Sequence, residues 1–132
     1  MASGGCFGMA PPEHFSPGVT MRRDYNKLVR DRIPCIIQEN GKQFAVEIMP
    51  EAEFRQALLE KLVEEAQEVP QAKLGGLINE LADLQEVISA VLAAWGISPQ
   101  AVQQVQDQRH AERGGFEQRF KLLWTEDGDE NV

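Results

Sequence analysis

The chain has 132 residues, of which 13 are basic and 21 acidic, so its formal net charge is −8 with both histidines neutral. This length fits one small domain, and 42% hydrophobic with 26% charged residues is typical of a globular chain. The acidic balance excludes a general binder of nucleic-acid polymers or of anionic membranes, because both need a basic face.

The sequence contains no targeting or membrane signal. No apolar run approaches the ~20 residues that a membrane span needs, and the N-terminus lacks a cationic start followed by an apolar stretch. The two cysteines, Cys6 and Cys35, lie in a glycine-rich stretch and in an apolar run, where we expect no structural disulfide. Together these features predict a cytoplasmic protein.

The first part of the chain contains a leader and short elements. Residues 1–22 are rich in Gly, Pro and Ser and have no apolar periodicity, which predicts a flexible leader. Pro34 fits the first turn of a short helix that Gly41 ends. The loose alternation of residues 43–49 predicts an extended segment before the longer helices.

Three longer helices are predicted after this segment. Pro50 opens the first, which carries apolar residues at three- and four-residue spacing until Pro70 ends it. The second covers residues 77–95 and ends before a glycine, and the third covers residues 98–113 and begins with a Ser-Pro pair.

The predicted fold is therefore an all-α antiparallel helix bundle. It occupies residues 23–125, and the last residues, 126–132, form an acidic tail. We expect this tail to be solvated.

The charge imbalance is concentrated in two places. The tail contributes −4, and residues 60–86 carry seven acidic and two basic side chains, a net charge of −5. This window contains the run 64-EEAQE-68 at the end of one predicted helix and 80-ELAD-83 at the start of the next. Residues 60–86 are therefore the candidate functional region.

Helical spacing places these carboxylates on neighbouring flanks. Glu64 and Glu68 lie about 40° apart around one helix, and Glu80 and Asp83 share a face of the next. Like charges at this spacing destabilise a helix, and a bound cation would offset that repulsion. Oxygen ligands favour Mg²⁺ or Mn²⁺ over zinc. The alternative is that the acids form an ordinary solvated face of the helices.

Four motifs in chain order resemble a known family. EExxE at 64–68 followed by ExxD at 80–83 resembles the MazG-like all-α nucleoside triphosphate pyrophosphohydrolases. The opening 25-YNKLVRDRIP-34, the tripeptide 96-GIS-98 and the closing 113-RGGF-116 are similar to its phosphoribosyl-ATP pyrophosphohydrolase-like branch. The resemblance covers about residues 24–123.

The resemblance implies roles for the acidic residues. The metal ligands, for Mg²⁺ with Mn²⁺ as a substitute, would be Glu65, Glu68, Glu80 and Asp83. Glu64 would be a further ligand or would orient the attacking water, so Glu64 and Glu65 are the predicted catalytic residues. The resemblance also implies a homodimer or homotetramer that completes the bundle.

An acidic site needs basic groups as well, to contact the phosphates of a substrate. The candidates are Lys27 and Arg30 in the opening motif, Lys61 one turn before the EExxE run, and Arg113 before the closing glycines. We therefore predict a Mg²⁺-dependent enzyme that cleaves a nucleoside triphosphate between its α and β phosphates, giving monophosphate and pyrophosphate, in house-cleaning of non-standard nucleotides. Two alternatives stay open. One is phosphoribosyl-ATP pyrophosphohydrolase of histidine biosynthesis, and the other is a non-catalytic helical protein that binds a nucleotide or metal.

Overall fold

The computed structural model describes residues 21–126 and is all-helical in that range, which confirms the predicted fold class. These residues fall into two compact units, one ending at Trp95 and the other beginning at Gly96. Most of the predicted leader and all but the first residue of the predicted acidic tail lie outside the described residues.

The described part of the first unit begins with residues 21–32, which we call the N-terminal segment, followed by the short helix α1, Ile33–Glu39. Pro34 lies in its first turn, where the missing N–H of proline removes no helical hydrogen bond. The helix ends at Asn40 and Gly41, whose φ of 74° is in the left-handed region that favours glycine. Residues 42–50 then continue without regular secondary structure, so the predicted extended segment forms no strand.

Helix α2, Glu51–Glu68, follows Pro50 and carries Glu51 and Glu53 in its first turn. Acidic side chains there interact favourably with the positive end of the helix dipole. Helix α3, Leu77–Ala94, begins after a turn that contains Gly75 with a φ of 84°. Both helices match their predicted ranges to within two residues.

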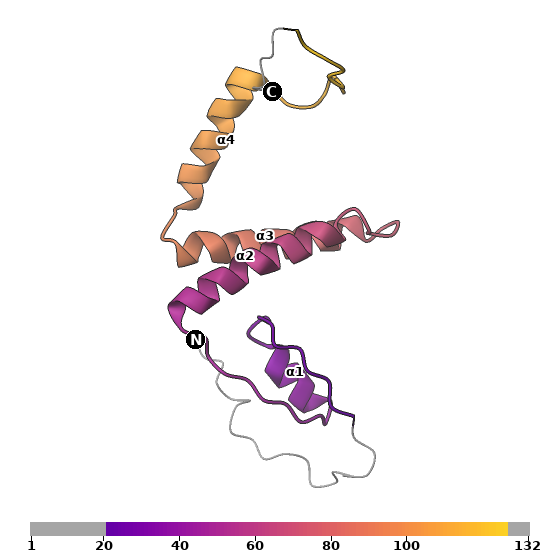
Figure 1. The fold of residues 1–132 in the computed structure, drawn as a ribbon, viewed down its shortest axis with the longest axis vertical. Coiled ribbons are helices and arrows are strands. Elements are labelled where there is room, and N and C mark those ends of the chain that lie inside the picture. Colours follow the sequence, from indigo (N-terminus) through magenta and orange to yellow (C-terminus); the bar gives the residue numbers. More distant parts are fainter. Residues whose placement is uncertain (1–20, 127–132) are drawn as a thin grey trace. The chain divides into compact units, whose positions relative to one another are not determined.

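The two helices lie side by side and run in opposite directions (Figure 1). Arg55 joins the start of α2 to the end of α3, since its guanidinium donates a hydrogen bond to the carbonyl of Ala94 at 3.0 Å and lies 5.3 Å from the ring centre of Trp95. The guanidinium also pairs with Glu51 at 2.8 Å. This contact fixes the open end of the helical pair, opposite the turn.

The second unit contains helix α4, Pro99–Arg113. The hydroxyl oxygen of Ser98 accepts a hydrogen bond from the backbone N–H of Ala101 at 3.1 Å, which satisfies one of the free donors at the helix N-terminus. Gly114, with a φ of 81°, ends the helix. Both ends agree with the prediction from the Ser-Pro and Gly-Gly signals.

Cys35 is disulfide-bonded in the structure, so the expectation of no disulfide was wrong for this residue. No single helix of residues 21–126 is long and apolar enough to cross a membrane, although α3 and α4 taken together meet the same length and composition test.

The hydrophobic core of the described residues is small. Only Leu58 of α2 and Val87 of α3 are buried among their hydrophobic side chains, with 3% and 8% of their surface exposed. Many large apolar side chains of the two helices and their turn stay exposed, namely Leu59, Val63, Leu74, Leu77, Ile78, Leu81 and Ile88. Small domains with so little core usually need a further source of stability, and oligomerisation is one.

We propose that a second copy of the chain covers this exposed apolar surface, in a homodimer or homotetramer. Val63→Glu should then weaken association, because it places a charge in the buried interface. Light scattering should give an integer multiple of the 14.8 kDa chain mass for the wild type and a lower average mass for the variant.

Val46→Glu is a matched control, because Val46 is as exposed as Val63, at 53% against 55%, but lies outside the helices. This control should keep the wild-type mass. A monomeric wild type at micromolar concentration contradicts the proposal.

Candidate functional site

The carboxylates predicted from the EExxE and ExxD motifs lie on adjoining flanks of α2 and α3. We call them the acidic site, and they are Glu64, Glu65, Glu68, Glu80 and Asp83. Of the three carboxylates that form ion pairs, Glu64, Glu65 and Asp83, Glu65 is the least exposed, with 15% of its side-chain surface accessible. Burial raises the pKa of Glu65, and the negative charges of Glu68, Asp83 and Glu64 raise it further against the lowering effect of Lys61. The structure therefore brings acids of both helices within electrostatic range of one another.

Two lysines approach Glu64 from different parts of the chain. The ammonium of Lys61, one turn earlier in α2, lies 3.2 Å from one carboxylate oxygen of Glu64, and the ammonium of Lys27 lies 3.4 Å from the other. Lys61 also lies 3.9 Å from Glu65. The hydrogen bond from Lys61 lowers the pKa of Glu64, partial burial opposes this, and Lys27 lowers it further. Glu64 is thus ionised over a wider pH range than an ordinary glutamate.

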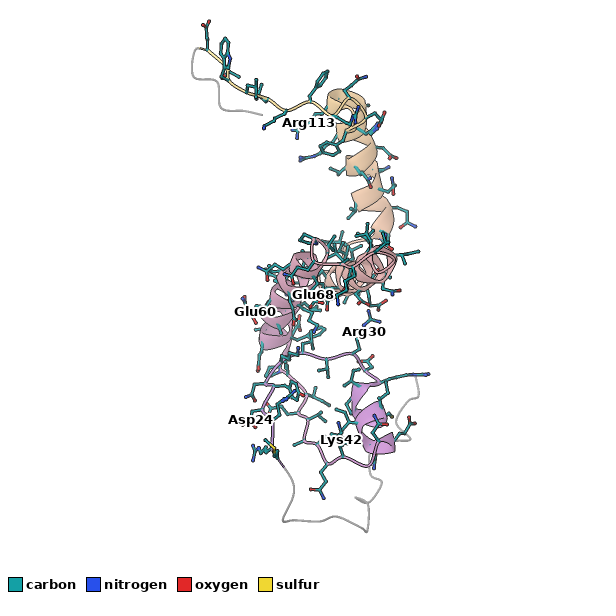
Figure 2. The ribbon with its side chains drawn as sticks, turned by 90° about the vertical axis from the view of Figure 1, so that its right-hand side faces the viewer. Asp24, Arg30, Lys42, Glu60, Glu68 and Arg113 are labelled. Atoms are coloured by element: carbon teal, nitrogen blue, oxygen red, sulfur yellow. The ribbon has the colours of Figure 1, made fainter. Side chains whose placement is uncertain are left out.

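A third cation reaches the other helix. The Arg30 guanidinium donates a hydrogen bond to Asp83 of α3 at 2.9 Å. Figure 2 shows Arg30 on the N-terminal segment, on the side that faces α2 and α3. Lys27 and Arg30 therefore tie one short segment to both helices, although they are 37 and 53 residues away from their partners in the sequence.

Glu68 and Glu80 have a different environment. Both line an open cavity of about 580 Å³ at the turn between α2 and α3, together with Lys73 and Asn79. Within the described part of the chain, no basic side chain forms an ion pair with either glutamate. Their charges are therefore not neutralised by a direct partner.

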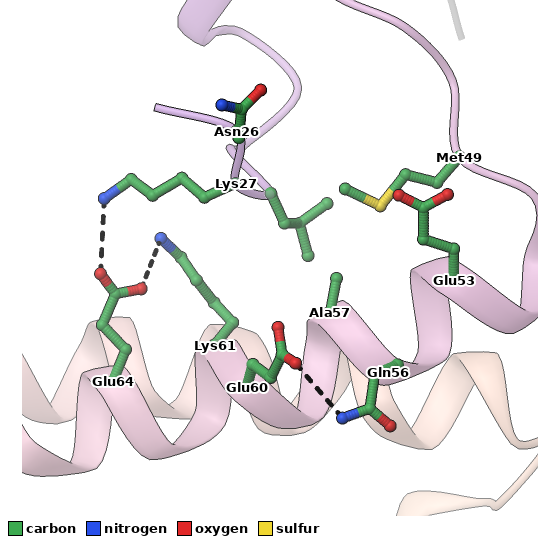
Figure 3. A pocket seen from close by; sticks show the side chains of 10 residues that line it. Asn26, Lys27, Met49, Glu53, Gln56, Ala57, Glu60, Lys61 and Glu64 are labelled. Atoms are coloured by element: carbon green, nitrogen blue, oxygen red, sulfur yellow. Dashed lines mark hydrogen bonds and ion pairs between the residues drawn. The ribbon is translucent and has the colours of Figure 1, made fainter. Parts of the chain in front are cut away.

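A second open cavity, of about 450 Å³, begins at Glu64 and extends toward the start of α2 (Figure 3). Lys27 and Lys61 line it at the Glu64 end. The carboxylates of Glu64 and Glu68 thus each belong to a different cavity, and Glu65 lies between them in the sequence of α2. The acidic site borders both cavities.

The chemistry of the acidic site fits a hard divalent cation. All its donors are carboxylate oxygens, which Mg²⁺ prefers, and the mutual repulsion that raises the pKa of Glu65 is the kind that a cation relieves. Within residues 21–126, no group of three or more His, Cys, Asp or Glu side chains is placed so that it could hold a metal ion. Magnesium usually keeps several waters and uses one or two carboxylates, so one or two of these carboxylates with water ligands are the set that would hold it.

Three of the four predicted phosphate-binding residues lie at this acidic site, namely Lys27, Arg30 and Lys61. Arg113 is the last residue of α4 and belongs to the second unit. Its role, like those of the other named residues, stays a prediction.

Seven other polar residues that line the cavities were not predicted from the sequence. These are Asn26, Glu53, Gln56 and Glu60 in the cavity at Glu64, and Gln71, Lys73 and Asn79 in the cavity at the turn. One signal existed for Gln56 and Glu60, since both lie on the helical row of Glu64 at four-residue spacing. Asn26 lies within the opening motif 25-YNKLVRDRIP-34, which was its one signal in the sequence, and its backbone has a positive φ of 47°.

The comparison with protein families gives one match. A family model described as phosphoribosyl-ATP pyrophosphohydrolase matches residues 36–110, more than half of the chain. The chain belongs to this family. The family is part of the MazG-like all-α nucleoside triphosphate pyrophosphohydrolase superfamily, so the resemblance stated from the motifs is confirmed. No curated protein and no solved structure matches the chain.

Membership of the phosphoribosyl-ATP pyrophosphohydrolase family implies a hydrolase that acts on phosphoric anhydrides. The matched residues include all five carboxylates of the two motifs and Lys61. They exclude the segment with Lys27 and Arg30 and also the closing RGGF motif. The contacts of Lys27 and Arg30 with the matched helices are thus an independent structural observation.

The Arg30–Asp83 pair should contribute little to the stability of the fold, because its side chains are 56% and 45% exposed. A double-mutant cycle with Arg30→Met and Asp83→Asn should give a coupling energy of about 0.2–1 kcal/mol in urea unfolding. The Arg55–Glu51 pair within α2 is the matched control, with about 0.3–0.5 kcal/mol. A coupling of several kcal/mol for Arg30–Asp83 would show that the pair serves the fold, not a substrate.

Proposed function

We propose that this protein is a Mg²⁺-dependent nucleotide pyrophosphohydrolase that cleaves a nucleoside triphosphate between the α and β phosphates, releasing the monophosphate and pyrophosphate. The observation that carries the proposal is the meeting of acids from α2 and α3 with three cations within one small region. Membership of a family of pyrophosphohydrolases supports the reaction class.

The residues that would hold the metal are Glu65, Glu68, Glu80 and Asp83. When bound, Mg²⁺ would neutralise part of the negative charge of the polyphosphate and would activate a water molecule. Without such a cation the acidic helices would repel a triphosphate, since residues 60–86 alone carry a net charge of −5.

Glu64 is the residue that would orient the attacking water. Its carboxylate is kept ionised by Lys61 and Lys27, and an ionised carboxylate accepts a hydrogen bond from water. It lies at the border of a cavity that is open to solvent. The same two lysines lower the proton affinity of Glu64, so its proposed role is to orient the water and not to take up its proton.

Lys27, Arg30 and Lys61 serve as the phosphate contacts. Each already lies at the acidic site, and an ammonium has three donors, so one lysine can bridge a carboxylate and a phosphate oxygen at once. The planar guanidinium of Arg30 suits two oxygens of one phosphate. Fixed cations of this kind stabilise the charge that develops on transferring phosphoryl groups.

A second candidate substrate is phosphoribosyl-ATP, which the description of the matching family names. It would use the same carboxylates and cations, because it carries the same triphosphate. House-cleaning of non-standard nucleotides completes the proposal for the first candidate.

Glu68→Gln should abolish the reaction, because it removes a charge from the proposed metal site. We expect at least about 100-fold loss of pyrophosphate release, the size of effect that even outer partners of metal ligands have. The assay uses a panel of nucleoside triphosphates and phosphoribosyl-ATP, with Mg²⁺, with Mn²⁺ and with a chelator.

Glu86→Gln, an exposed glutamate farther along α3, is the matched control and should keep full activity. The chelator should abolish the activity of both the wild type and this control. Turnover of no nucleotide by the wild type would favour the non-catalytic alternative and contradict the proposal.

A further inference from the structure

The N-terminal segment is joined to α2 and α3 by two polar contacts within the described part of the chain. These are the ion pair of Lys27 with Glu64 at 3.4 Å and that of Arg30 with Asp83 at 2.9 Å. No backbone hydrogen bond among the described residues joins the segment to either helix. The polar attachment of the segment therefore depends on two side chains.

The apolar attachment of the segment is also small. Of residues 21–32, Leu28 and Val29 are half-buried and the others are exposed. Leu28 lines the cavity at Glu64 together with Met49 and Ala57, and these three side chains form its apolar wall (Figure 3). Segments with few buried contacts open at a low free energy.

Both ion pairs of the segment are open to water. Their four side chains are between 38% and 56% exposed. Exposed pairs of this kind are weak and are screened by salt. A ligand that competes for either partner can therefore separate them.

The two carboxylates that the segment contacts belong to the acidic site. Asp83 is one of the proposed metal ligands, and Glu64 is the residue that would orient the water. The five carboxylates of the site and the three cations that pair with them, Lys27, Arg30 and Lys61, have a net charge of −2. A divalent cation bound there would share a carboxylate with Arg30, and the two positive charges would repel each other.

Phosphate oxygens are the alternative partners for these side chains. In the structure, the Arg30 guanidinium donates one hydrogen bond to a carboxylate oxygen of Asp83. The same planar group can donate two parallel hydrogen bonds to a phosphate. Once the charge of Asp83 is neutralised by a cation, a phosphate becomes the better partner for Arg30.

We propose that the N-terminal segment is a strap that opens when a divalent cation binds to the acidic site and closes again on a phosphate ligand. Lys27 and Arg30 leave their carboxylates when Mg²⁺ binds, and the phosphates of a Mg²⁺-bound ligand recapture both side chains. The proposal rests on the proposed pyrophosphohydrolase function. The ion pairs in the structure are the contacts with which the cation competes.

The test follows the strap by NMR in the full-length, isotope-labelled protein and does not depend on turnover. Heteronuclear NOE values of the backbone amides of residues 26–32 report their motion on the ps–ns timescale. Mg²⁺ should lower these values, and inorganic pyrophosphate added with Mg²⁺ should raise them again. Sodium chloride at matched ionic strength should lower them less, because it only screens the ion pairs.

Arg30→Met removes one of the two ion pairs. Because coupling between two binding events is reciprocal, loss of a contact that Mg²⁺ disrupts should tighten Mg²⁺ binding. We expect about two- to fivefold tighter binding, the range for one exposed ion pair, in a titration followed by the amide shifts of α3. The NOE values of this variant should be low without Mg²⁺, and pyrophosphate should not restore them.

Two further variants make this result specific. Arg32→Met makes the same chemical change in the same segment, at a side chain that forms no ion pair with any described residue, and it should behave as the wild type. Lys27→Met removes the other ion pair and should change the NOE values and the Mg²⁺ affinity in the same direction as Arg30→Met.

The proposal is overturned if Mg²⁺ loosens the segment no more than matched sodium chloride does, or if the wild type binds no Mg²⁺. It is also overturned if Arg30→Met weakens Mg²⁺ binding, because Arg30 would then orient Asp83 for the metal. Failure of pyrophosphate to raise the NOE values overturns it as well.

The outcome is separable from the fate of the proposed function. If the segment opens with Mg²⁺ and closes with pyrophosphate but no nucleotide is cleaved, the strap stands and the enzymatic proposal fails. If nucleotides are cleaved while the NOE values of residues 26–32 stay constant, the enzymatic proposal stands and the strap fails.

Discussion

The contact of Lys27 and Arg30 with the carboxylates of α2 and α3 is the interaction on which the account of this site depends. Helix α2 by itself would present a row of acids with one lysine, which is an ordinary solvated surface. The N-terminal segment adds cations on both helices, at 3.4 Å from Glu64 and 2.9 Å from Asp83. These exposed ion pairs are individually worth little to the fold, which is consistent with the proposal that the acids and cations serve a shared ligand.

The same contact organises the space around the acids. The segment that carries Lys27 also forms one side of the cavity that extends along α2 from Glu64, and Leu28 contributes to its apolar wall. At the other end of the acidic run, Glu68 and Glu80 border the cavity at the helical turn. The acidic residues therefore border two separate cavities, one at each end of the EExxE run.

The helices and the acidic motifs could be predicted from the sequence because their signals are local. Pro50, Gly75 and Ser98 begin or separate helices through their own backbone chemistry, and the spacing of the carboxylates fixes which of them share a flank. The pairing of Arg30 with Asp83 spans 53 residues and has no periodic signal, so the sequence motif suggested a role but no partner. The lining of the cavity at Glu64 and the disulfide of Cys35 depend on tertiary placement, which no local pattern encodes.

On the proposed function, the carboxylates of α2 and α3 hold a divalent cation next to Lys27, Arg30 and Lys61. Mn²⁺, which binds oxygen ligands as Mg²⁺ does, broadens the NMR signals of nearby nuclei. Substoichiometric Mn²⁺ added to the isotope-labelled protein should selectively broaden the amide signals around Glu65, Glu68, Glu80 and Asp83, and excess Mg²⁺ should reverse the effect. Uniform broadening across all acidic residues, including Glu39 and Glu112, or no broadening at these four positions, would contradict the claim.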